Sequence, residues 1–98
     1  MKVYLKRLGS RDPKKYQVTV GDKSIKFGAR GYSNFTVHKD PLRMQRYLIR
    51  HKKRENWSDP TTPGFWSRWL LWSEPTLKDA KALIKRKFGL VVVTHVSR

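Results

Sequence analysis

The stretch that decides the fold is residues 57–72, WSDPTTPGFWSRWLLW, which holds all four tryptophans of the chain. Large aromatic side chains bury so much surface that a small domain can build much of its core from them. From Phe65 to Trp72 the residues are apolar on nearly every side of a helical projection, which is typical of a buried helix. We therefore expect a short helix over residues 64–72, entered through a linker at residues 58–63.

A strongly basic segment, residues 40–56 (DPLRMQRYLIRHKKREN), comes before most of these tryptophans. Asp40 is a good N-cap and Pro41 suits a first helical turn, so a helix is predicted from there to about Asn56. Its apolar side includes Tyr47. Spacings of three, four and seven residues bring the basic side chains into one stripe on another side of this helix: Arg43, Arg46, Arg50, Lys53 and Arg54.

Strand patterns begin and end the chain. Residues 16–20 (YQVTV) alternate between apolar and polar side chains, and Gly21-Asp22 offers a two-residue hairpin turn before a return strand that carries Ile25 and Phe27. A first strand is expected over residues 3–8, and the β-branched run at 90–96 (LVVVTHV) predicts a last one.

Two segments connect these patterns. Residues 28–39 (GARGYSNFTVHK) are expected to form an ordered loop, anchored to the core by Tyr32 and Phe35. A third helix is expected after Thr76, which forms a capping box with Asp79, and Gly89 is its natural stop.

The predicted order is β-β-β-α-α-α-β, which indicates an α+β domain. A small, mainly antiparallel sheet of N-terminal strands plus the C-terminal strand would pack against about three short helices. A length of 98 residues suggests a single basic domain over residues 1–98. The chain has no cysteine, which excludes disulfides and thiolate metal sites. No apolar run approaches the ~18 residues of a membrane span, and residues 1–15 lack the apolar core of a signal peptide, so a soluble protein is expected.

The charge balance points to a polyanionic partner. With 23 Lys and Arg against 7 Asp and Glu, the formal net charge is +16. Such a charge on a small fold causes self-repulsion, which binding to phosphates would relieve, so nucleic acid is the leading candidate. An anionic membrane surface and an acidic protein stay open, because net charge alone does not separate them.

The basic stripe is the best candidate surface, because arginine can donate two parallel N–H groups to phosphate oxygens. The alternative is that the stripe is only a solvated helix face that keeps the protein soluble. Few acidic residues are present to neutralise the stripe, and this favours contact with phosphate. A second basic row on the third helix would extend the surface, and its members are Lys78, Lys81, Lys85 and Arg86.

Two other features are weaker candidates for nucleic-acid contact. The glycine-rich loop could present backbone N–H groups to a phosphate beside Arg30 and Lys39, although a structural connection explains its glycines equally well. Tryptophans can stack on unpaired bases. We assign Trp66, Trp69 and Trp72 to the core, and Trp57 is the tryptophan most open to stacking.

Nothing in the chain favours an enzyme. His38, His51 and His95 match no zinc motif, and surface or hydrogen-bonded histidines explain them best. No GxSxG nucleophile motif and no GxxxxGK[ST] phosphate loop occurs. We therefore expect no catalytic residues, no metal site and no cofactor.

Several blocks of the chain are distinctive, namely GYSNFTVHKDPLR (residues 31–43), RYLIRHKKRENW (46–57), GFWSRWLLW (64–72) and the Pro75-Thr76 pair. Through these blocks the chain resembles a family of small basic proteins encoded by large nucleocytoplasmic DNA viruses of amoebae and algae. The N-terminal hairpin and the C-terminal strand lie outside the blocks. The resemblance implies a viral protein of the virion, or of the viral factory in the host cytoplasm or the nucleus.

From these patterns we expect a non-enzymatic nucleic-acid-binding protein. Its partner would be double-stranded DNA, bound with low sequence specificity, and its role would be viral genome compaction or packaging. The alternative is a structural virion protein or adaptor that binds acidic viral or host proteins. A phosphodiester-cleaving enzyme is a third reading, and it would need a metal site. An exposed sheet edge would also allow a homodimer.

Overall fold

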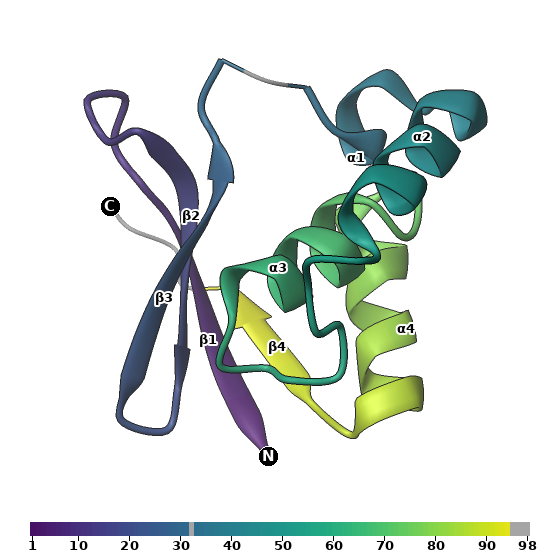
Figure 1. The fold of residues 1–98 in the computed structure, drawn as a ribbon. Helices are drawn as coiled ribbons and strands as arrows, with labels where there is room; N and C mark the ends of the chain where they lie inside the picture. Colours follow the sequence, from purple (N-terminus) through teal and green to yellow (C-terminus); the bar gives the residue numbers. More distant parts are fainter. Residues whose placement is uncertain (32, 95–98) are drawn as a thin grey trace.

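The computed structural model of the chain describes residues 1–31 and 33–94. Its elements are β1 (Lys2–Arg7), β2 (Lys14–Val20), β3 (Lys23–Ala29), α1 (Phe35–His38), α2 (Pro41–His51), α3 (Pro63–Trp66), the π-helical turn η1 (Ser67–Leu71), α4 (Leu77–Phe88) and β4 (Val91–Thr94). All the helices lie on one side of the sheet (Figure 1), so the predicted α+β class is confirmed.

The sheet of the described residues has four strands in the order β3-β2-β1-β4. β2 pairs antiparallel with both β1 and β3, whereas β4 adds in parallel to β1, with Val92 opposite Val3. The sheet is therefore mixed and mainly antiparallel. The predicted hairpin is present, because Val20 pairs with Lys23 and Gly21 takes a φ of 61° in the turn.

The core lies between the inner face of the sheet and the helices. Trp66 and Phe65 are fully buried there, and the indole Nε1 of Trp66 donates to the Pro60 carbonyl at 2.7 Å. This bond satisfies the polar atom of an otherwise apolar side chain. The predicted buried helix is thus confirmed, with Thr62 as its N-cap and a continuation through η1. Its main core partners are Val3, Leu5, Val18, Ile25, Phe27, Leu70, Ala80 and Ile84.

The structure corrects two local predictions. The segment 28–39 is not one loop, because Gly28 and Ala29 belong to β3 and Phe35–His38 forms the short helix α1. The side chain of Asn34 caps α1 by accepting the N–H of Thr36 at 3.0 Å. The last strand begins at Val91 rather than Leu90, and the predicted end of that strand, like the anchor at Tyr32, lies outside the described residues.

The basic helix is also shorter than predicted, since α2 ends at His51 and not near Asn56. Tertiary contacts explain the early end. The carbonyl of Trp57 accepts the indole N–H of Trp69 at 2.7 Å, so the chain must turn back toward η1 soon after α2. A longer helix would also align Arg46, Arg50 and Arg54 at spacings of four residues, where like charges repel.

The close approach of β3 to η1 gives a test of this packing. Gly28 has a φ of +78°, and a Cβ built there would lie 3.0 Å from Cδ1 of the buried Leu71. We expect Gly28→Ala to lower the free energy of unfolding by about 2 to 3 kcal/mol, from backbone strain plus overpacking.

Two further glycines serve as controls in the same chemical denaturation experiment. Gly21→Ala places a side chain at a positive φ with no neighbour within 4 Å, so it should cost only the strain, about 1 to 2 kcal/mol. Gly9→Ala adds neither backbone strain nor a close contact, so it should leave the free energy of unfolding nearly unchanged. Equal losses for Gly28→Ala and Gly21→Ala would show that the contact with Leu71 is unimportant.

Candidate nucleic-acid interface

The arginines of α2 stand in solvent on a well-defined helix. Arg43, Arg46 and Arg50 are all exposed. Asp40 fixes the start of the helix, because its Oδ1 accepts the N–H of Leu42 at 3.0 Å and Pro41 occupies the first turn. In the described part of the chain, ion pairs join Lys26 to Asp12 and His51 to Glu55, and none involves an arginine of α2. These three guanidinium groups are therefore available to a ligand.

An aromatic stack attaches α2 to the rest of the domain. Tyr47 is 6% exposed, and its ring lies parallel to that of Trp72, with centroids 4.4 Å apart and an interplanar angle of 2°. His51 stacks on Tyr47 at 4.2 Å. Burial raises the pKa of Tyr47, so its hydroxyl stays neutral at ordinary pH. Because Trp72 follows directly after η1, this stack links the basic helix to the aromatic core.

Only one side of α2 is covered by the domain. Leu42 is 64% exposed and Ile49 is 74% exposed, and Val37 in α1 is exposed to a similar degree. Helical spacing puts Arg43 and Arg50 on the flank next to Tyr47, whereas Arg46 lies farther from the covered side. The stripe is thus divided between a flank that faces the sheet and a side that faces solvent.

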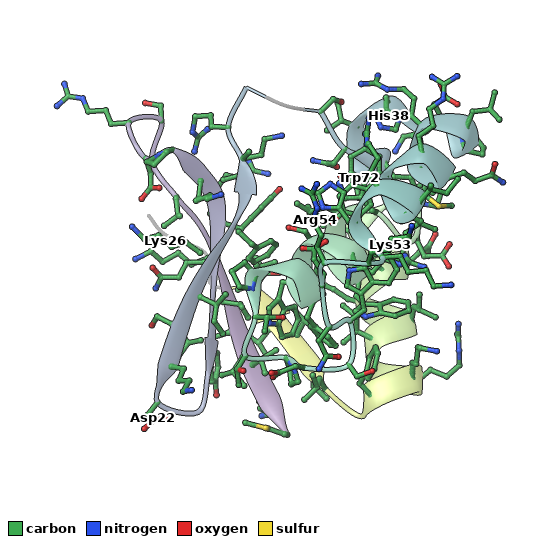
Figure 2. The ribbon with its side chains drawn as sticks, viewed as in Figure 1. Asp22, Lys26, His38, Lys53, Arg54 and Trp72 are labelled. Carbon is green, nitrogen blue, oxygen red and sulfur yellow. The ribbon has the colours of Figure 1, made fainter. Side chains whose placement is uncertain are left out.

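Lys53 and Arg54 are exposed but lie in the turn that follows α2, where the N–H of Arg54 donates to the His51 carbonyl at 3.0 Å. Figure 2 shows both on the helical side of the molecule, together with Trp72 and His38, and far from Asp22 on the β2–β3 hairpin. They extend the basic surface of α2 without belonging to its helical row.

The second basic row lies on α4, on the same side of the sheet as α2 (Figure 1). Thr76 begins this helix as predicted, since its Oγ1 accepts the N–H of Asp79 at 3.1 Å, and Gly89 ends it with a φ of 71°. Lys81 is half-buried, and its Nζ donates to Oγ1 of Thr94 in β4. The other members are exposed, namely Lys78, Lys85 and Arg86.

Arg30 and Lys39 use their nitrogen atoms within the protein. The Arg30 guanidinium donates to the carbonyls of Asp12, Leu8, Gly9 and Lys14 at 2.8, 3.2, 3.0 and 3.2 Å, which closes the loop between β1 and β2. The Lys39 Nζ donates to the Thr36 carbonyl at 2.9 Å and to the Pro75 carbonyl. Both residues hold loops together here, and their contact with nucleic acid stays a prediction.

Trp66 belongs to the core, and Trp69 and Trp72 pack against it. Arg68, which the sequence analysis did not single out, lies over two tryptophan rings. The Arg68 guanidinium lies 4.3 Å from the ring centroid of Trp69 and 5.4 Å from that of Trp57, and it donates to the Trp72 carbonyl at 3.0 Å. Burial lowers the pKa of Arg68, but a guanidinium remains protonated at neutral pH. Trp57 is half-buried beneath this cation and is less open to stacking than its sequence context indicates. The sequence does carry a sign of this contact, because Arg68 is the one charged residue within the apolar stretch GFWSRWLLW.

The histidines have local structural surroundings. His38 Nδ1 accepts the N–H of Asp40 at 2.9 Å. The pKa of His38 is lowered mainly by desolvation and to a smaller extent by the positive charge of Arg43. His51 Nδ1 lies 3.0 Å from Glu55 Oε1, close enough for an ion pair, yet that oxygen accepts no hydrogen bond. His95 lies outside the described residues.

Residues 1–31 and 33–94 were also compared with the requirements of a metal site and of a membrane-spanning helix. No group of three or more His, Asp or Glu side chains there could hold a metal ion. No helix of that part is long and apolar enough to cross a bilayer.

Comparison with protein families places part of the chain in a known family. The model described as Family of unknown function (DUF5754) matches residues 3–51, from β1 to the last residue of α2. The match includes the N-terminal strands, which the distinctive blocks at residues 31–76 leave out, and it ends before the GFWSRWLLW block. Comparisons with curated proteins and with solved structures found no match.

The stack between Tyr47 and Trp72 predicts how α2 responds to mutation. Tyr47→Ala removes the buried ring of α2 and should cost about 3 to 5 kcal/mol of stability, in the range of large aromatic truncations. Hydrogen exchange should show that the amides of α2 lose protection before those of β1–β3.

Tyr47→Phe keeps the stacked ring and is the matched control, with protection of α2 close to that of the wild type. Protection of α2 that is unchanged in Tyr47→Ala, in protein that remains folded by circular dichroism, would mean that other contacts hold the helix.

Proposed function

This chain belongs to the Family of unknown function (DUF5754), and we propose that it is a non-enzymatic nucleic-acid-binding protein. Its partner is double-stranded DNA, which it binds through phosphates with low sequence specificity. The observation that carries the proposal is the row of exposed α2 arginines without acidic partners in the described part of the chain.

Electrostatics support a phosphate polymer as the ligand. A net charge of +16 on 98 residues generates a positive potential that attracts polyanions and speeds their association. Each phosphate that meets a lysine or arginine releases condensed counterions, and this release favours binding. Contacts to phosphate fix position but carry no sequence information, so a surface made of arginines and lysines gives low specificity.

The fold supports a rigid cationic surface. Arg46 is exposed and lies farther from the covered side of α2 than Arg43 and Arg50 do, and Lys53 and Arg54 continue the surface beyond the helix. A guanidinium on a helix that is held by packing loses less conformational freedom on binding than one on a mobile tail. The exposed cations of α4 extend the same side of the molecule, and they are Lys78, Lys85 and Arg86.

The resemblance to proteins of large DNA viruses extends the proposal to a biological role. A compact cationic domain would neutralise a viral genome during compaction or packaging. The protein would then be found in the virion, and before assembly in the viral factory of the host cytoplasm or in the nucleus.

One observation favours the alternative of an adaptor that binds an acidic protein. Val37, Leu42 and Ile49 are 66%, 64% and 74% exposed beside the arginines of α2. Apolar side chains next to arginines are more typical of protein interfaces than of phosphate-binding surfaces. A partner that stays bound after nuclease treatment and at raised salt would favour the adaptor.

The DNA-binding proposal predicts the effect of neutralising α2. The triple variant Arg43→Gln, Arg46→Gln and Arg50→Gln should bind a short duplex at least about tenfold more weakly at moderate salt. Because three phosphate contacts are lost, the slope of log K against log salt should become shallower by about 2 to 3. Fluorescence anisotropy across a salt series measures both quantities.

The matched control is Lys2→Gln, Lys6→Gln and Lys23→Gln, which removes the same charge from exposed strand positions. This control should retain most of the affinity. Equal losses in the two triple variants would mean that net charge, and not the surface of α2, governs binding.

A further inference from the structure

We propose that the cavity between the sheet and α2 binds one nucleotide, with its phosphate at the basic mouth and its base against the aromatic wall. This inference goes beyond binding of a duplex to the outside of α2, which needs no cavity. It concerns a nucleoside phosphate, either free or as an unpaired nucleotide of a strand.

The cavity is large enough for such a ligand. Its volume is about 570 Å³, within the range usual for small-molecule sites. The first residues of β2 and the last residues of β3 line one wall, and α2 lines the other. The start of α3 and the turn η1 complete the lining. A lone phosphate ion would leave most of this space unfilled. A nucleotide has the volume to fill it, with a phosphate that suits the basic side chains and a base that suits the aromatic ones.

Cations reach the cavity from two opposite walls. Lys14 comes from β2, where it pairs with Ala29 of β3, and Arg43 and Arg50 come from the flank of α2. The two arginines are seven residues apart, so they lie about two helical turns apart on one face. No acidic partner of these three side chains occurs in the described part of the chain. Charges that converge from separate elements favour a phosphate between them.

One part of the cavity lining is apolar and aromatic. Phe27 and Leu71 line it, beside the stack of Trp72, Tyr47 and His51. Tyr47 is covered on both faces, but His51 ends the stack and its side chain is 42% exposed. A planar base can extend such a stack, since every base has a π-face that accepts aromatic contact.

One acid inside this basic cavity helps to orient the ligand. Glu55 lines the cavity, and its carboxylate lies so close to Gly64 that a Cβ there would meet Oε2 at 2.2 Å. Its Oε1 lies 3.0 Å from His51 Nδ1 but accepts no hydrogen bond, and the amino group of a base can donate to it. The same negative charge repels phosphate from the inner part of the cavity and leaves it near Lys14 and the arginines.

Isothermal titration with three ligands tests the site. Deoxyadenosine monophosphate should bind with a stoichiometry of one, and about tenfold or more tighter than either inorganic phosphate or deoxyadenosine alone. Affinity for inorganic phosphate equal to that for the nucleotide would overturn the assignment of a base-binding wall. Absence of any heat from the nucleotide would overturn the site itself.

Matched variants locate the binding. Lys14→Glu should abolish nucleotide binding, whereas Lys6→Glu, the same change at an exposed strand position outside the cavity, should leave it intact. Ala29→Trp places a large ring at the mouth without changing charge and should also abolish it. Loss in the Lys6 variant as well, or retention in Ala29→Trp with unchanged thermal stability, would contradict the assignment.

The same variants separate this site from duplex binding. Ala29→Trp should bind a blunt duplex like the wild type, so failure of either proposal leaves a distinct pattern. The same variant identifies the source of the nucleotide. A short single strand that binds Ala29→Trp more weakly than the wild type, while the blunt duplex binds both equally, assigns the cavity to an unpaired nucleotide of a strand. Equal binding of the single strand by both proteins assigns the cavity to the free nucleotide.

Discussion

The parallel stack of Tyr47 on Trp72 is the interaction on which the basic surface depends, because it holds the arginine-bearing helix α2 to the core. Charges on α2 repel one another and the other cations of a chain whose net charge is +16. Burial of the Tyr47 ring offsets this repulsion, and the arginines stay in solvent at defined positions. A stack of rings suits this task because it needs no acid, so it leaves the positive surface unneutralised.

The sequence predicts those parts of the structure that are determined by residues close together in the chain. The hairpin at Gly21, the cap at Asp40 and the buried helix around Trp66 follow from patterns of a few residues, and all three are confirmed. The end of α2 is set instead by contacts with η1, which no local pattern encodes. The cavity is hidden for the same reason, since Lys14 and Arg50 are distant in the sequence and meet only in the folded chain.

The two proposals share Arg43 and Arg50 but use them in different ways. In the first, these arginines join Arg46 and the turn at Lys53 and Arg54 in contacting the regularly spaced phosphates of a duplex. The inward flank, with Arg43 and Arg50, faces a cavity whose aromatic wall suits a single base. The family match ends at His51, so it includes α2 and the strands that form the opposite wall. The arginines of α2 and most of the cavity lining therefore belong to the part of the chain that the family model matches, whereas Lys53 and Arg54 lie beyond it.

The central claim is that α2 is where nucleic acid is bound, and mapping backbone amide shifts of the labelled wild-type protein against a short blunt duplex tests it most directly. The account predicts that the largest shift changes fall between Arg43 and Arg54, with smaller changes on α4 and almost none on the uncovered face of the sheet. Changes concentrated around Tyr4 and Lys6 on that open face, or no changes at low salt, would contradict it.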